Sequence, residues 1–118
     1  MTLTFPKHEK LKSRKAIKQL FEEGKAVTKY PVKLLYVPAA NQEHTQAGFA
    51  VPKRNFKSAV TRNQIKRIMR EGYRLQKEAF LAEKDKKFSL LFIYIGKETL
   101  PYKTIEKAIK GTLKKCIL

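Results

Sequence analysis

The stretch from Ala59 to Arg74 constrains the fold most, because its sequence divides a helix into two unlike sides. At the 100° per residue of an α-helix, its cationic side chains and Asn63 fall within an arc of roughly 140°. This cationic arc holds Arg62, Asn63, Lys66, Arg67, Arg70, Arg74 and Lys77. The opposite arc holds Ile65, Ile68, Met69, Gly72, Leu75 and Ala79. The pattern predicts an amphipathic helix, capped by Ser58 or Thr61 and running to about Leu81, with its apolar side in the core.

The cationic arc is expected to face a polyanion. A solvated surface is the ordinary interpretation of a charged helix face, but solvated helices usually mix charges of both signs at i,i+4. Here only Glu71 and Glu78 lie at the margin of the arc. Guanidinium groups match two phosphate oxygens and stack on bases, and an amide such as that of Asn63 can read a base edge or a ribose. This chemistry favours RNA over a membrane surface, which requires only charge.

The composition supports the same partner. The chain has 118 residues, 27 Lys and Arg against 10 Asp and Glu, a net charge of +17 and a pI of about 10.1. No acidic residue occurs between Glu43 and Glu71. This balance predicts salt-sensitive binding to nucleic acid and, as a weaker alternative, to an anionic membrane. A chain of this length is expected to form one domain, residues 1–118, with an extended basic arm at residues 1–12.

Cysteine usage and hydropathy indicate a cytoplasmic protein. Cys116 is the only cysteine, so neither a disulfide within the chain nor a cysteine-based zinc site is expected. The N-terminal residues lack the apolar core of a signal peptide. The longest apolar run, Phe88–Ile95, is far shorter than the roughly 18 residues that span a bilayer.

Periodicity predicts the order helix, three strands, helix, strand, helix, in an α+β sandwich with a four-stranded sheet. The first helix is predicted between Ser13 and Gly24, and its apolar spacing alone makes Phe21 an ordinary core aromatic. Strands are predicted at residues 26–28, 32–37, 48–53 and 88–95. The first strand is expected at an edge, the third in a hairpin with the second, and the last, apolar on both faces, in the middle of the sheet. The last helix is predicted to open at Pro101 and to turn its lysines outward.

A shallow trough is predicted on one face of this sheet. Gly48 and Ala50 would form its floor, because successive side chains of a strand point to opposite faces. Phe21 and Tyr36 would stand at its wall, and Lys53 and Arg54 at its end. A single strand of RNA in such a trough could stack its bases on the aromatic rings while cations follow its phosphates. The alternative is that the small residues only allow a helix to pack closely, as Gly72 is expected to do for the sheet.

The basic stretch resembles the signature of the bacterial ribonuclease P protein subunit. The resemblance is carried by the string Ala59-Val60-x-Arg62-Asn63-x-x-Lys66-Arg67-x-x-Arg70-Glu71. It extends to Leu11, Leu20-Phe21 and Gly24, and to Gly48-Phe49-Ala50-Val51-Pro52-Lys53-Arg54. It covers nearly the whole chain, residues 9–115, and implies an α/β sandwich with a left-handed crossover at the long helix, an exception to the usual right-handed rule.

Membership in this family implies an accessory role in the removal of the 5′ leader from precursor tRNA. The catalyst is then a large RNA that uses Mg²⁺, and this chain has no catalytic residues, no metal and no obligate protein partner. By position, the implied RNA contacts are Lys53, Arg54, Arg62, Asn63, Lys66, Arg67, Arg70 and Arg74. The implied contacts to the single-stranded leader of precursor tRNA are Phe21, Tyr36 and Ala50.

Two other functions compete with this one. A stand-alone nuclease would need a paired-carboxylate metal site or a partnered histidine, and His8 and His44 lie in an expected arm and loop without matched partners. The composition also permits a basic binding module of another kind, such as a ribosomal protein or other RNA-binding module without a role in cleavage, or a DNA-reading helix protein, although no compact second helix or dimer surface of a DNA reader is predicted. A membrane-surface role is disfavoured because the basic helix lacks Trp and large exposed apolar residues.

Overall fold

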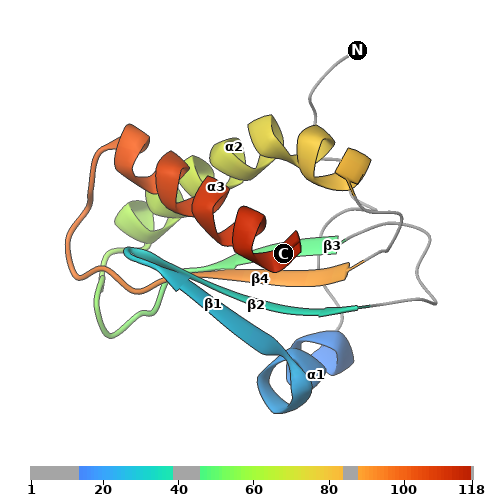
Figure 1. Ribbon diagram of the computed structural model, residues 1–118. Helices are drawn as coiled ribbons and strands as arrows, with labels where there is room; N and C mark the ends of the chain where they lie inside the picture. Colours follow the sequence, from blue (N-terminus) through green and yellow to red (C-terminus); the bar gives the residue numbers. More distant parts are fainter. Residues whose placement is uncertain (1–13, 39–45, 84–87, 118) are drawn as a thin grey trace.

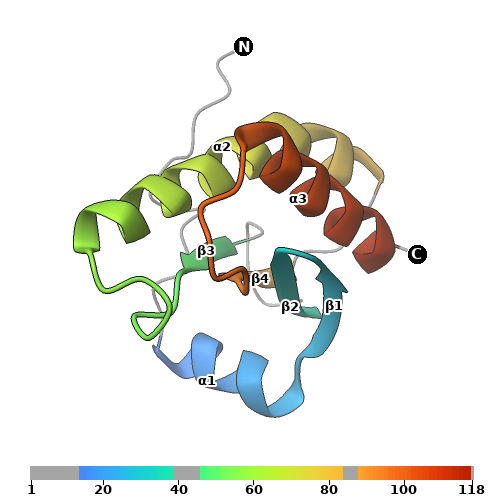
Figure 2. The same ribbon diagram turned by 90° about the vertical axis from the view of Figure 1, so that its left-hand side faces the viewer.

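The computed structural model describes residues 14–38, 46–83 and 88–117, which form three helices and a four-stranded sheet. The elements are α1 (Arg14–Glu23), β1 (Lys25–Lys29), β2 (Val32–Pro38), β3 (Gln46–Ala50), α2 (Ala59–Glu83), β4 (Phe88–Tyr94) and α3 (Tyr102–Ile117). Helix α1 covers one face of the sheet, and α2 and α3 lie side by side on the other (Figures 1 and 2). The predicted order of elements and the α+β layout are confirmed. The predicted arm at residues 1–12, the Ser13 cap, His8 and His44 lie outside the described residues.

The strand order is β1-β2-β4-β3, so β4 lies between β2 and β3 and β1 is an edge strand, as predicted. The predicted hairpin between the second and third strands is wrong. Strand β2 pairs antiparallel with β1 and β4, whereas β3 pairs parallel with β4, with Phe49 opposite Phe92. A strand that is apolar on both faces needs cover above and below the sheet, and β4 obtains it in the middle of the sheet, between the two cores.

The third strand is also displaced from its predicted bounds. It spans Gln46–Ala50, and the chain leaves the sheet at Val51 and turns, with the Asn55 N–H donating to the Pro52 carbonyl at 3.2 Å. A proline cannot donate to a strand ladder, so pairing ends before Pro52.

The connection from β3 through α2 to β4 is left-handed, as the family resemblance implies. In Figure 1 both strands run from right to left beneath α2, and Figure 2 places β4 on the side of β3 toward β2 and β1. A right-handed connection with α2 on this face would place β4 on the other side of β3.

The sheet separates two cores of unequal size. The larger core lies beneath α2 and α3 and includes Phe92, Tyr94, Ile65, Met69 and Tyr73, all fully buried. The smaller core lies beneath α1 and consists of Leu20, Leu35 and Leu91, with partly buried apolar neighbours. The α1 face is therefore only partly covered.

The buried side of helix α2 is rotated about the helix axis relative to the predicted apolar arc. Tyr73 falls within the predicted cationic arc, yet it is fully buried, with its ring centroid 5.5 Å from that of Phe92 and 6.0 Å from that of Phe49. Leu75, expected in the core, is 44% exposed. Gly72 does allow a close approach, but to α3 and not to the sheet, because a Cβ there would lie 3.4 Å from Ile109 Cγ1. The buried arc is therefore centred between Ile65 and Tyr73.

Candidate nucleic-acid interface

The outward side of α2 carries a row of exposed basic and amide side chains. Asn63, Arg67 and Arg70 are exposed, and Lys66 is half-buried at the margin. Arg74 is half-buried and its Nε donates to the Glu71 carboxylate one turn away. Since the opposite side of the helix is anchored by Ile65, Met69 and Tyr73, these side chains share an outward direction. Asn63, Lys66, Arg67 and Arg70, together with Arg74, form what we name the α2 face.

Arg62 differs from the rest of this row. Its Nη1 donates to the carbonyl oxygens of Phe56 at 2.8 Å and Lys57 at 3.0 Å, the last residues before the helix cap. Ser58 is that cap: its Oγ accepts from the Thr61 N–H at 3.3 Å, and its carbonyl accepts from the Arg62 N–H at 3.1 Å. Arg62 therefore holds the loop against the helix, and one part of its guanidinium is already engaged within the protein.

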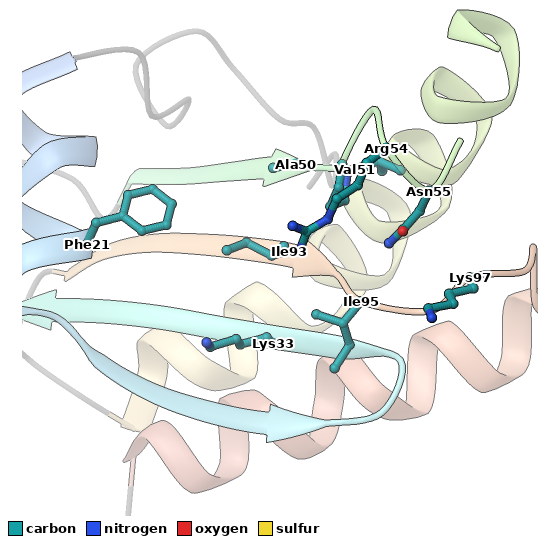
Figure 3. Close-up of a pocket in the computed structure, with 10 residues that line it drawn as sticks. Phe21, Lys33, Ala50, Val51, Arg54, Asn55, Ile93, Ile95 and Lys97 are labelled. Atoms are coloured by element: carbon teal, nitrogen blue, oxygen red, sulfur yellow. The ribbon is translucent and has the colours of Figure 1, made fainter. Parts of the chain in front are cut away.

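The predicted trough is present as a groove of about 750 Å³ on the α1 face of the sheet (Figure 3). Its lining comprises Phe21, Lys33, Ala50, Val51, Pro52, Arg54, Asn55, Ile93, Ile95 and Lys97. Phe21 stands at one end, and Asn55 and Lys97 lie at the other (Figure 3). The predicted residues Phe21, Ala50 and Arg54 are thus brought together. Gly48, predicted for the floor, and the exposed Lys53 do not line the groove.

Phe21 is not the core aromatic that its spacing predicts. It is 63% exposed, whereas its neighbour Leu20 is fully buried against Leu35 and Leu91. A short helix on a narrow core buries one residue per turn, so the second apolar residue of the pair is left at the margin. An exposed aromatic ring beside a groove is a platform on which a planar base can stack.

The predicted position of Tyr36 in the trough is wrong. Tyr36 packs against the larger core on the α2 and α3 side, with its ring centroid 6.3 Å from that of Phe88. Alternate residues of a strand point to opposite faces of the sheet. Tyr36 therefore points to the same face as Val32 and Leu34, which both lie in that core. Tyr36 is therefore separated from the groove by the sheet itself.

Two lysines of the groove were missed by the sequence analysis. Lys33 and Leu35 are two residues apart on β2, so both point to the α1 face of the sheet. The alternation of side chains along this strand was the signal that could have identified Lys33. Lys97 follows β4 in a loop and carries no such signal. With Arg54, these residues give the groove three cationic side chains around an apolar floor that includes Ala50 and Ile93.

The loop that carries Lys97 is held in place by Tyr94. The Tyr94 hydroxyl donates to the Glu98 carbonyl at 2.6 Å and accepts from the Leu100 N–H at 3.2 Å. Burial raises the pKa of Tyr94, so its hydroxyl keeps its proton. The Ile95 N–H also donates to the Pro31 carbonyl at 2.7 Å, which joins this loop to the turn between β1 and β2. The far end of the groove is therefore fixed by hydrogen bonds.

Basic residues also connect the groove with the α2 face. Lys53, Arg54 and Lys57 lie in the loop that runs from the end of β3 to the start of α2, and all three are exposed. A polyanion could follow this loop from one side of the sheet to the other.

Two further properties of the described residues bear on chemistry. No three His, Cys, Asp or Glu side chains within them converge as metal ligands, and the expectation that the protein holds no metal stays a prediction. Among the described helices, none combines the length and the apolar character that crossing a membrane requires.

Comparison with known proteins identifies the family. The model of the ribonuclease P family matches residues 5–117. The ribonuclease P protein component of Porphyromonas gingivalis is 34% identical over 119 residues, covering 95% of this chain and 85% of that protein. The component from Petrotoga mobilis is 33% identical over 108 residues, covering 92% of this chain and 80% of that protein.

Solved structures agree with this assignment at the level of the fold. The RNase P protein of Staphylococcus aureus superposes with a TM-score of 0.78 at 20% identity, covering 92% of this chain and 94% of that one. The RNase P protein of Thermotoga maritima superposes with a TM-score of 0.74 at 24% identity, covering 91% and 96%. Because the family model spans nearly the whole chain and the relatives align over most of both lengths, the chain belongs to the ribonuclease P protein component family.

Proposed function

We propose that this chain is the protein subunit of ribonuclease P, which binds the RNA subunit and the 5′ leader of precursor tRNA and assists removal of that leader. The RNA subunit contacts the α2 face, and the single-stranded leader lies in the groove on the α1 face of the sheet. The observation that carries this proposal is the pairing of an outward row of Arg, Lys and Asn on α2 with a separate groove that combines an exposed aromatic ring and three cations.

The chemistry of the α2 face suits a folded RNA, whereas that of the groove suits an unpaired strand. The α2 face carries three Arg, one Lys and one Asn, which suit the phosphates and base edges of a large folded RNA. The groove is concave and partly apolar, and Phe21 is 63% exposed at its end. Such a surface suits an unpaired strand, whose bases are free to stack while Lys33, Arg54 and Lys97 meet the phosphates.

We assign the hydrolysis to the RNA subunit and to the Mg²⁺ ions that it binds. The protein acts by holding the leader and so raising the affinity of the holoenzyme for precursor over mature tRNA. Neutralisation of phosphates by the cationic protein also lowers the concentration of Mg²⁺ that the RNA needs. Precursor tRNA is a primary transcript, so we place this activity in the bacterial cytoplasm.

The test is cleavage of precursor tRNA at low Mg²⁺ by the protein alone, by the RNA subunit alone and by the two together. We expect cleavage only when both are present, at the 5′ end of the mature tRNA. Cleavage by the protein alone would identify a stand-alone nuclease. Failure of the protein to stimulate the RNA subunit would favour a basic ribosomal or other RNA-binding module without a role in cleavage, which the +17 charge also fits.

A further inference from the structure

Helix α3 carries a row of lysines that neither proposed site uses. Lys103, Lys107, Lys110 and Lys114 recur at i, i+4, i+7 and i+11, which places them within an arc of about 60° on a helix. All four are exposed, whereas Ile105, Ile109 and Thr112 on the other side are fully buried. Because the buried side fixes the rotation of α3, the row points away from the sheet. We name these four residues the α3 row.

A fifth lysine joins the row from another element. Lys29, at the end of β1, lays its aliphatic stem across α3 at Gly111, where a Cβ would lie only 3.2 Å from Lys29 Cγ. Glycine is a poor residue for a helix interior, and here it leaves the space that the lysine stem occupies. The cationic surface is therefore assembled from two elements and is not a property of one helix alone.

The α3 row is separated from the α2 face by a seam that carries two acidic residues, Glu71 on α2 and Glu106 on α3. Glu71 is paired with Arg74 at the edge of the α2 face. The two helices meet here, since a Cβ at Gly72 would lie 3.5 Å from Glu106 Cα. The carboxylates interrupt the positive surface, so one segment of polyanion on the α2 face does not simply continue onto the α3 row.

The chemistry of the α3 row points to the backbone of a double helix. The four residues of the row include no Arg, no Asn and no aromatic side chain. Lysine is a flexible point charge that binds phosphate without the planar fork of arginine. The row extends about 16 Å along the helix, with roughly 5–6 Å between successive side chains, which is the scale of consecutive phosphates on one strand. A surface of this kind suits double-stranded RNA, which is recognised through its backbone.

We propose that the α3 row and Lys29 hold the phosphate backbone of a double-helical segment of the ribonuclease P RNA, distinct from the segment on the α2 face. The inference rests on the proposed function. Helices α2 and α3 cover the same side of the sheet, opposite the groove assigned to the leader (Figure 2). One large RNA on that side can meet both helices, whereas the substrate approaches the α1 side.

The test measures the affinity of the protein for the RNA subunit without precursor, as a function of salt. The variant is Lys107→Ala/Lys114→Ala, and the matched control is Lys15→Ala/Lys18→Ala, which removes two exposed lysines from α1 on the other face. We expect the variant to lower the slope of log K against log[salt] by about 2 and to weaken binding about tenfold or more. The control should change affinity less than about twofold, and Lys107→Arg/Lys114→Arg should bind like the wild type, because it keeps both charges.

The outcomes separate this inference from the proposed function. An unchanged slope in the α3 variant, or an equal loss in the α1 control, would overturn the inference. So would a variant that keeps its affinity for the RNA subunit and raises only KM for precursor, because the row would then serve the substrate. If the wild type itself fails to bind the RNA subunit, the proposed function fails. If Arg67→Ala/Arg70→Ala weakens binding and the α3 variant does not, only this inference fails.

Hydroxyl-radical footprinting of the RNA subunit adds a direct readout. We expect Lys107→Ala/Lys114→Ala to lose protection along one duplex and to keep the protections that Arg67→Ala/Arg70→Ala removes. Loss of the same protections by both variants would mean that the two surfaces share one segment of RNA, which contradicts the inference.

Discussion

Replacement of Phe21 by alanine tests whether the exposed ring is a stacking platform for the leader. The ring is 63% exposed, so only about a third of its surface contributes to folding. A buried aromatic side chain covers roughly 150–250 Å², which at about 25 cal/mol per Å² limits the loss of stability to about 1–2 kcal/mol. A base stacked on the ring contributes about 1–3 kcal/mol, so affinity for the leader should fall by roughly 5- to 150-fold.

The assay compares two substrates bound by the holoenzyme, precursor tRNA with a leader of several nucleotides and mature tRNA without one. Phe21→Ala should weaken binding of the precursor and leave binding of mature tRNA unchanged. Phe21→Tyr should retain affinity, whereas Phe21→Leu should lose it, because leucine restores apolar area but offers no flat ring.

Leu20 provides the matched control on the same turn of α1. It is fully buried, so Leu20→Ala should cost about 2–5 kcal/mol of stability and, at a temperature where the variant is folded, leave the preference for precursor intact. The reasoning would be refuted if Phe21→Ala bound precursor and mature tRNA in the same ratio as the wild type, or if its loss of stability matched that of Leu20→Ala.

Three other perturbations follow from the structure. Arg67→Ala/Arg70→Ala should weaken binding to the RNA subunit while changing the free energy of unfolding by less than about 0.5 kcal/mol per site, since both side chains are exposed; a large fall in Tm would show that they are structural. Gly72→Leu should destabilise the protein by about 1–3 kcal/mol, measured by urea denaturation, because its side chain must enter the contact with Ile109, whereas Gly72→Ala should be close to neutral. Tyr94→Phe should cost about 1–3 kcal/mol by loss of the hydroxyl's two hydrogen bonds. Since the folded-state pKa of Tyr94 is raised above its unfolded value of about 10, wild-type stability should fall as pH rises through and above that value, and less steeply in Tyr94→Phe; equal slopes would exclude Tyr94 as the titrating group.

The order of elements and the amphipathic helix α2 could be predicted because they depend on local periodicity. The exact rotation of α2 could not, since charged residues with long stems tolerate partial burial. Arg62 and Lys66 are half-buried at the margin of the core, and this lets the ring of Tyr73 enter the core between them. The buried arc is therefore displaced from the apolar arc that residue types alone predict, and Leu75 lies outside the core.

The pairing of β3 could not be predicted from its neighbours in sequence. Consecutive strands are usually neighbours, but β4 is apolar on both faces and is buried best in the middle of the sheet, where it separates β2 from β3. The groove was predicted in part, because Ala50 follows from strand parity and Phe21 from the family resemblance. Lys97 could not be predicted, because its loop is fixed by the Tyr94 hydroxyl and by the contact of Ile95 with Pro31, and no periodic pattern in the sequence indicates these hydrogen bonds.

The central position of β4 has a consequence for biosynthesis. This strand is the last to leave the ribosome, yet it is the sole neighbour of β3 and one of the two neighbours of β2. Before β4 is available, the chain has α1, the β1–β2 hairpin, β3 and α2, but β2 and β3 have no strand that joins them. We expect purified chains that end before β4 to be digested rapidly by protease and the full chain to be resistant, so that the fold forms only once β4 has left the ribosome.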